Sequence, residues 1–241
     1  MDDSSIWEVC AADCHDSQIQ VAAGQAETWS IKNLMKINAD KTKDMAISFS
    51  RKHTNIPAVT IDGKAVERTK TFTLLGVVLS DDITWGDHVE YLHGKCSQRL
   101  YLLILLKRAG VTAQDILRIY TTMIRSVLEY ACPVWHTSLT KTQSDRLESI
   151  QKRALRTLYP EQSYSQSLEC LGIQTLHQRR EELSRAFFTD LMSPAHKLNY
   201  LLPKARAVRH SLRHQTQYPR LACKHNRYQN TLIPYGLAHW Q

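Results

Sequence analysis

The pattern of apolar residues changes its period near residue 86, and this change limits the folds that the chain can adopt. Residues 72–79 (Phe-Thr-Leu-Leu-Gly-Val-Val-Leu) are apolar and partly β-branched, which is typical of a buried strand interrupted at Gly76. From about residue 89 onward, apolar residues recur every three to four positions, which indicates amphipathic helices. The sequence therefore predicts an α+β chain in which a small mixed region precedes an all-helical region.

The region before this change combines one expected helix with short antiparallel strands. A helix is expected over about 17–35, where apolar residues repeat at helical spacing. Strands are expected over 45–49 and over 59–66, the second as a hairpin that turns at Asp62-Gly63. With so few strands, this region is expected to be too small to close a sheet by itself.

Helix start and stop signals divide the rest of the chain into four helices and a tail. Beyond Pro203 the sequence is basic and has little periodicity, so we expect an extended, partly disordered arm. The expected regions are 1–85 (mixed), 86–195 (helical) and 196–241 (basic tail). The signals are Ala109-Gly110 at the end of the first helix, Thr112 at the start of the second, Pro133 at its end, and capping boxes at Thr140–Gln143 and Thr175–Gln178.

The net charge of +8 is unevenly distributed. Residues 1–90 hold 9 Lys and Arg against 14 Asp and Glu, whereas residues 91–241 hold 22 against 9. The last 45 residues hold 8 basic residues and no acidic ones. This asymmetry suggests a polyanionic partner for the C-terminal part, and the alternative is an ordinary basic protein with a flexible tail.

Several functional classes have no signature in the sequence. There is no G-x-x-x-x-G-K-[ST], G-x-G-x-x-G or G-x-S-x-G motif, so no small-molecule cofactor is expected. Cys10, Cys14 and His15 have metal-like spacing but lack a matching second pair. No apolar run approaches the ~18 residues of a membrane-spanning helix, so we expect no membrane span. No basic segment followed by an apolar run begins the sequence, so we expect no secretion signal. Scattered cysteines favour an intracellular location, cytoplasmic or nuclear.

An ordered series of short motifs is more informative than any single one. The series resembles the reverse transcriptases of non-LTR (LINE-type) retrotransposons, near the jockey and chicken-repeat branches, over roughly residues 1–235. Each motif is too short to identify a family by itself, and the specificity comes from the order in which the motifs follow one another. The motifs are Met1-Asp-Asp-Ser-Ser-Ile-Trp-Glu8, Asn33-Leu-Met-Lys-Ile-Asn-Ala-Asp-Lys-Thr-Lys43, Leu74-Leu-Gly-Val-Val-Leu79, Ile83-Thr-Trp85 and Arg125-Ser-Val-Leu-Glu-Tyr-Ala-Cys-Pro-Val-Trp135.

The resemblance implies an RNA-directed DNA polymerase and assigns roles to a few residues. Asp2 and Asp3 match the acids of the Tyr-x-Asp-Asp loop, so Asp2 would ligate catalytic Mg²⁺. Lys41 would neutralise or protonate the leaving pyrophosphate, or is simply a solvated lysine in a loop. Leu75 and Gly76 match the strand of the primer grip. The motif tyrosine, the fingers and the first palm carboxylate are missing, so we expect this chain alone to be inactive and to bind no Mg²⁺ stably.

The remaining sequence resembles the end of the palm and the thumb, which binds RNA or an RNA/DNA template-primer through its phosphates. The alternative for its cations is an ordinary solvated basic surface. Basic and aromatic tail residues could bind RNA by charge and stacking, or form a solubilising tail. The thumb candidates are Lys95, Arg99, Lys107, Arg108, Lys152, Arg153 and Arg156, and the tail candidates are Arg206, Arg209, Arg213, Tyr218, Arg220, Arg227 and Tyr228.

Three other interpretations stay open. The chain could be a non-enzymatic module that binds element RNA or a complete element polymerase. It could be a pseudogene product with no selected function, which predicts poor folding and exposed apolar surface. Residues 83–159 also resemble the short N-terminal helical segment of AlkB homologue 8, whose enzymatic activities belong to other domains.

Overall fold

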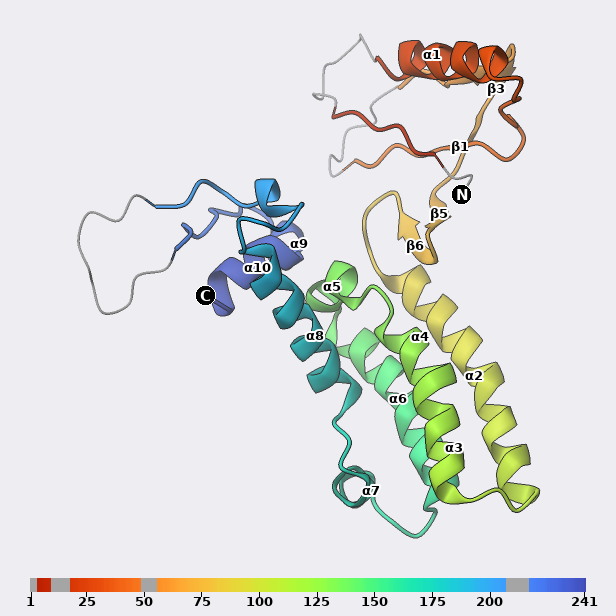
Figure 1. The fold of residues 1–241 in the computed structure, drawn as a ribbon, viewed down its shortest axis with the longest axis vertical. Helices are drawn as coiled ribbons and strands as arrows, with labels where there is room; N and C mark the ends of the chain where they lie inside the picture. Colours follow the sequence, from red (N-terminus) through yellow and green to blue (C-terminus); the bar gives the residue numbers. More distant parts are fainter. Residues whose placement is uncertain (1–3, 10–17, 49–55, 207–216) are drawn as a thin grey trace. The chain divides into compact units, whose positions relative to one another are not determined.

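The computed structural model describes residues 4–9, 18–48, 56–206 and 217–241 (Figure 1). The chain divides into two compact units, residues 1–87 and 88–241. Helices and short strands occur in the first unit and helices in the second, so the predicted α+β class is confirmed. The elements are α1 (Ile19–Lys32), β1 (Lys43–Asp44), β2 (Thr60–Ile61), β3 (Lys64–Ala65), β4 (Glu67–Arg68), β5 (Thr71–Leu74), β6 (Val77–Ser80), α2 (Gly86–Arg108), α3 (Ala113–Ile119), η1 (a π-helix, Tyr120–Arg125), α4 (Ser126–Glu129), α5 (Cys132–Trp135), η2 (His136–Ser138), α6 (Lys141–Leu158), α7 (Tyr164–Leu171), α8 (Leu176–Leu191), η3 (Asn199–Leu201), α9 (Asn226–Gln229) and α10 (Leu232–His239).

In the N-terminal unit, α1 packs on the β2–β3 hairpin around a small apolar core. The buried residues of this core are Ala23, Val59, Ile61 and Val66. The hairpin turns at Asp62-Gly63 as predicted, and both residues have positive φ (52° and 70°), as a type I′ turn requires. The core is small because the strands are two residues long, so it buries little apolar surface.

Two strand predictions need correction. The expected single strand over 72–79 is a hairpin in which β5 and β6 pair antiparallel on either side of Leu75-Gly76. Both turn residues have positive φ (48° and 80°), so Gly76 allows a reversal rather than a break within one strand. Over 45–49, residues 45–48 form no strand and residue 49 is not described. The short strand β1 lies just before them, and it pairs parallel with β4, not antiparallel as expected.

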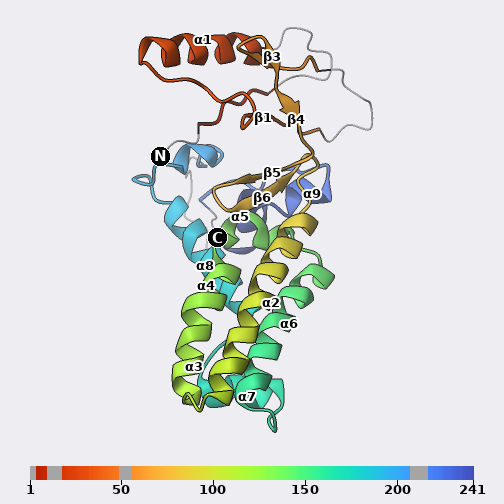
Figure 2. The same cartoon turned by 90° about the vertical axis from the view of Figure 1, so that its right-hand side faces the viewer.

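The helical unit is a bundle in which α2, the α3–η1–α4 segment and α6 run alongside one another (Figures 1 and 2). Thr112 caps α3, and both parts of the predicted capping boxes at Thr140 and Thr175 are formed. A third capping box, at Ser163, opens α7 and was not predicted. The buried side chains include Leu92, Cys96, Leu100, Leu103, Ile116, Tyr120, Ile124, Leu128, Leu147, Ile150, Ala154 and Leu155.

Pro133 begins a helix and does not end one. The preceding helix ends at Glu129, and Ala131 adopts a left-handed conformation (φ 51°) that reverses the chain. Pro133 then lies in the first turn of α5, where its missing N–H costs no hydrogen bond. The prediction failed because a proline signals a helix start as well as a helix stop.

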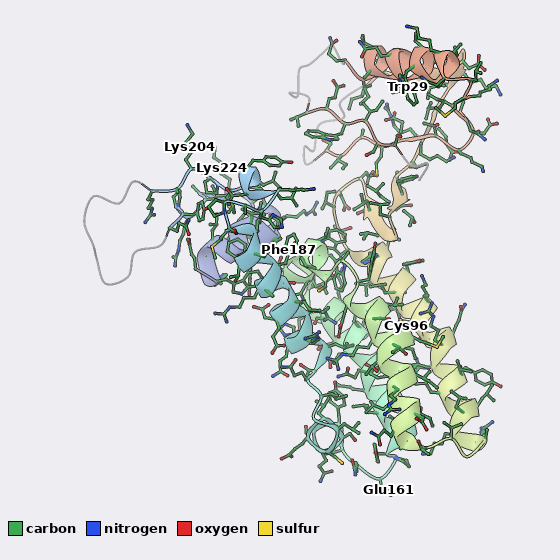
Figure 3. All side chains as sticks on the ribbon, in the orientation of Figure 1. Trp29, Cys96, Glu161, Phe187, Lys204 and Lys224 are labelled. Atoms are coloured by element: carbon green, nitrogen blue, oxygen red, sulfur yellow. The ribbon has the colours of Figure 1, made fainter. Side chains whose placement is uncertain are left out.

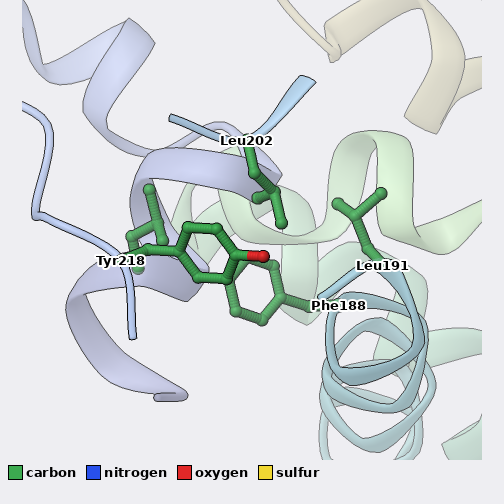
Figure 4. Packing of buried hydrophobic residues seen from close by; sticks show 5 residues of the cluster. Phe188, Leu191, Leu202 and Tyr218 are labelled. Atoms are coloured by element: carbon green, nitrogen blue, oxygen red, sulfur yellow. The ribbon is translucent and has the colours of Figure 1, made fainter. Parts of the chain in front are cut away.

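Residues 196–206 and 217–241, here called the C-terminal cap, fold back onto α8. Tyr218 and Leu237 from the cap are buried against Phe188 and Leu191 of α8 (Figure 4). This part of the predicted arm is therefore packed, and the prediction missed it because its apolar residues are too sparse to show a period. Arg209 and Arg213 lie outside the described residues. Within the described ranges, no helix has both the length and the apolarity needed to cross a bilayer.

Candidate nucleic-acid interface

Three polar contacts align α6 with α2 and show that the two helices run in the same direction. The Arg146 guanidinium lies 2.5 Å from a Glu90 carboxylate oxygen near the start of both helices. In the middle, Arg153 donates to the Ser97 hydroxyl at 3.4 Å. At the far end, the Lys107 ammonium donates to the carbonyl of Thr157 at 2.5 Å.

The exposed flank of α6 beside α2 carries a row of arginines, here called the α6 arginine row: Arg146, Arg153 and Arg156. All three are exposed, and at ~100° per residue they lie within ~80° of one another around the helix axis. The centre of this arc lies ~140° from Leu147 and ~80° from Ile150, both fully buried, so the row lies on the flank of α6 that borders α2. The row therefore presents three guanidinium groups along ~15 Å of helix. Arg146 is paired with Glu90, so Arg153 and Arg156 are the two charges of the row that best suit the phosphates of a nucleic-acid strand.

The electrostatic effect of this row is visible at His93 on α2. Partial burial lowers the pKa of His93, and the charges of Arg146 and Arg153 lower it further, while Glu90 raises it. Burial is the largest cause of this shift, and the two arginines add to it with the sign expected of positive charges near the ring. Lys152, exposed one residue before Arg153, lies 5.4 Å from the ring centroid of Tyr164 and so faces α7.

Lys95 and Arg99 lie on the other flank of α2. Arg99 donates to the carbonyl of Met123 in η1, where the wider turns of a π-helix weaken the regular backbone bonding. The Lys95 ammonium lies 3.0 Å from the Tyr91 hydroxyl and 5.2 Å from the centre of its ring. The structure thus places the seven predicted cations in more than one group, with these two facing η1 rather than α6.

Lys107 and Arg108 end α2, and the two differ in role. Lys107 donates to the carbonyls of Thr157 and Leu158, at 2.5 and 3.3 Å, and so caps the C-terminus of α6. Arg108 is exposed. Lys107 is therefore partly committed to joining the helices, whereas Arg108 is available to an external anion.

The residues that match the primer grip form the tip of the β5–β6 hairpin. The side chain of Leu75 is 61% exposed there although its backbone has positive φ, which is unfavourable for a residue with a Cβ. Phe72, on β5, is also partly exposed. An exposed, conformationally strained apolar tip is unusual on a free surface and is more often found at functional sites.

The predicted catalytic residues are not brought together by the described structure. Lys41 is exposed in the turn that follows α1, where its N–H donates to Asn38. Asp2 and Asp3 lie outside the described residues, so no metal chemistry is assigned to them. Across the part of the chain that the structure describes, no three His, Cys, Asp or Glu side chains gather in a way that could hold a metal ion.

The sequence reasoning missed a buried polar network that holds α6, α7 and α8 together. The carboxylate of Glu148 accepts the backbone N–H groups of Leu176 and His177, at 3.0 and 3.1 Å, in the first turn of α8. It also accepts the hydroxyl of Tyr164. Gln151 links Tyr164 to the hydroxyl of Tyr120, at 2.9 and 2.7 Å. A carboxylate in this position satisfies free N–H groups and complements the helix dipole.

A second buried group centres on Arg180, which is fully buried on α8. Its Nε donates to Nδ1 of His136 at 3.4 Å, and Nε2 of His136 lies 3.1 Å from Glu181. Burial and the nearby Arg180 charge lower the pKa of His136 to about 3, so its ring is neutral and carries its proton on Nε2. The sequence signal for this group was Arg180 itself, a charged residue at a position of α8 where the helical pattern expects an apolar one.

The comparisons with known proteins agree with the resemblance seen in the motifs. The chain is 23% identical, over 79% of its length, to the RNA-directed DNA polymerase from mobile element jockey of Drosophila funebris. It is 22% identical, over 75% of its length, to the "Probable RNA-directed DNA polymerase from transposon BS" of Drosophila melanogaster. The resemblance to the reverse transcriptases of these elements is confirmed. The chain spans about a fifth of the length of these relatives, 22% and 20%.

Two further comparisons found no relative. No family model matches the chain, and no solved structure matches it. The resemblance of residues 83–159 to AlkB homologue 8 stays a prediction.

Proposed function

We propose that this chain is part of a retrotransposon RNA-directed DNA polymerase and that its helical unit binds a template-primer as a thumb. The observation that carries the proposal is the α6 arginine row, which is exposed on one face of a helix in a chain similar to such polymerases. Arginine side chains bind phosphates without reading the base sequence, as a polymerase that must copy any template requires.

The proposal gives the other predicted cations secondary roles. Arg108 extends the positive surface at the end of α2, and Lys152 extends it toward α7. Lys95 and Arg99, of which Arg99 contacts η1, lie on the other flank of α2 and contact the duplex only if it covers both sides of this helix. Lys107 holds the end of α6 in place. We further propose that the tip formed by Leu75 and Gly76 contacts the primer strand through its exposed backbone and the Leu75 side chain.

We also propose that these 241 residues do not extend a primer by themselves. Two-metal phosphoryl transfer needs several carboxylates that hold the ions ~3.5–4 Å apart. The described residues form no such cluster, and only a fifth of the relatives' length is represented. Primer extension with the full chain in Mg²⁺ or Mn²⁺ tests this proposal, and synthesis above that of a heat-denatured sample would overturn it.

Binding to a labelled RNA/DNA hybrid, followed by fluorescence anisotropy at several salt concentrations, tests the thumb. Arg153→Ala and Arg156→Ala should each weaken binding several-fold, and each should reduce the salt dependence by about one phosphate contact. Arg118→Ala is the matched control, because Arg118 is an exposed arginine (73%) on α3 and not on α6. If Arg118→Ala weakens binding as much as the α6 variants do, the α6 arginine row is not the binding surface.

A further inference from the structure

The C-terminal cap carries a surface of one sign of charge that the thumb proposal does not use. No Asp or Glu follows Asp190 in the sequence. Asp190 itself lies 3.6 Å from His196. Lys197, Lys204 and Lys224 are exposed, and none of them forms an ion pair with another described residue. Figure 3 labels Lys204 and Lys224. These lysines therefore create a positive potential that no acidic group of the cap offsets.

Two tyrosines that lie near these lysines in the sequence of the cap expose their rings. Tyr200 is 76% exposed and Tyr228 is 53% exposed. Tyr200 lies between Lys197 and Lys204 in the sequence, and Tyr228 follows Lys224 by four residues. Not every tyrosine of the cap is exposed. Tyr218, which the sequence predicted as an RNA contact, is 5% exposed and belongs to the apolar core.

Hydrogen bonds fix the backbone at both exposed tyrosines. Beside Tyr200, the Asn199 side chain donates to the Leu191 carbonyl at the end of α8, at 3.0 Å. Beside Tyr228, the hydroxyl of Ser138 donates to the carbonyl of Asn230 at 2.9 Å, which joins α9 to η2. The backbone that carries each ring is therefore anchored to packed elements, and ordering this backbone on a ligand costs little additional entropy.

We propose that the C-terminal cap binds single-stranded nucleic acid, with bases stacked on Tyr200 and Tyr228 and phosphates bound by Lys197, Lys204 and Lys224. Stacking requires unpaired bases, so this surface takes a single strand rather than a duplex. An acidic peptide or an anionic lipid would use the lysines but has no base to stack on the rings. A dependence on both the rings and the lysines therefore identifies a nucleic acid.

Anisotropy of a fluorescein-labelled oligouridylate with the full chain tests the proposal. Tyr200→Ala and Tyr228→Ala should each weaken binding about fivefold or more, since each removes one stacked base. Tyr200→Trp should retain the affinity, because it restores a stacking ring. Tyr101→Ala is the control, since Tyr101 is a 60% exposed tyrosine on α2. The thermal midpoint of each variant checks that the fold is intact.

Three results would overturn the proposal. The first is that the unchanged protein does not bind the oligouridylate at low salt. The second is that both alanine variants bind with an affinity within twofold of the unchanged protein. The third is that Tyr101→Ala loses as much affinity as the two cap variants do. Vesicles that contain phosphatidylserine, tested in parallel, should bind with no dependence on Tyr200; a matching dependence would assign the surface to membranes instead. The cap variants should leave hybrid binding unchanged, and Arg153→Ala should weaken oligouridylate binding less than Tyr200→Ala does, so this inference and the thumb proposal can fail separately.

Discussion

Replacing Glu148 with alanine should destabilise the helical unit far more than an ordinary carboxylate substitution would. Glu148 is 8% exposed, and its carboxylate accepts three hydrogen bonds, from the backbone N–H groups of Leu176 and His177 and from the hydroxyl of Tyr164. Leu176 is fully buried, so its N–H has no access to water once the carboxylate is removed. The change thus removes a buried anion and leaves three donors without their acceptor.

The expected loss follows from these contacts. A buried donor left without a partner costs about 1–3 kcal/mol, and removing one member of a buried charged group typically costs about 3–5 kcal/mol. Because two of the three donors are only partly buried, water can reach them, and we expect Glu148→Ala to lower the free energy of unfolding by about 3–5 kcal/mol and not by the full sum. Glu148→Gln keeps one acceptor oxygen and should cost less.

Urea unfolding followed by circular dichroism measures this loss, and hydrogen exchange over residues 175–182 locates it. Glu182→Ala is the control, because Glu182 is a carboxylate on α8, the helix that Glu148 contacts, and is 52% exposed. Its loss should stay below about 1 kcal/mol. If Glu148→Ala costs no more than Glu182→Ala, or if exchange at the start of α8 is unchanged, the carboxylate does not hold α8 in place.

Three smaller predictions concern other strained or buried positions. Leu75→Asn should raise the thermal midpoint by a few degrees, because asparagine tolerates positive φ better by about 1 kcal/mol, and calorimetry showing no rise would contradict this. Gly236→Ala would place a Cβ 2.5 Å from the Phe188 ring, so it should lower the free energy of unfolding by about 1–3 kcal/mol and speed proteolysis of the cap. An unchanged cleavage rate would contradict the close packing of Gly236 against Phe188. The pKa of His136 is lowered to about 3, so the unfolded chain binds its proton first, and this residue alone should lower the free energy of unfolding by about 2 kcal/mol between pH 7 and 5, a contribution that His136→Gln should remove in pH-dependent unfolding.

Features set by neighbouring residues could be predicted from the sequence. The caps at Thr112, Thr140 and Thr175 formed as expected, because an N-cap needs only a hydroxyl and the backbone two or three positions later. The turn at Asp62-Gly63 formed for the same reason. The Leu75-Gly76 turn was missed, because leucine is not a residue that normally signals positive φ.

Features set by distant residues could not be predicted. Glu148 meets Leu176 across 28 positions of sequence, and only the packing of α6 against α8 brings them together. The sequence identified Lys107 as a cation but not as the cap of α6, because that role depends on how far α6 is shifted along α2. Charge can be read from a sequence residue by residue, whereas the direction in which a charge points depends on tertiary contacts.

The position of Glu148 links the two proposed binding surfaces. It anchors α8 to α6, and α6 carries the α6 arginine row while α8 supports the C-terminal cap. A surface variant such as Arg153→Ala should therefore weaken hybrid binding more than single-strand binding, and Tyr200→Ala should do the reverse. Glu148→Ala should weaken both together, near the temperature at which the start of α8 loosens, because it displaces the support that the two surfaces share. If Glu148→Ala instead leaves single-strand binding intact while exchange at the start of α8 rises, the cap folds independently of that helix start.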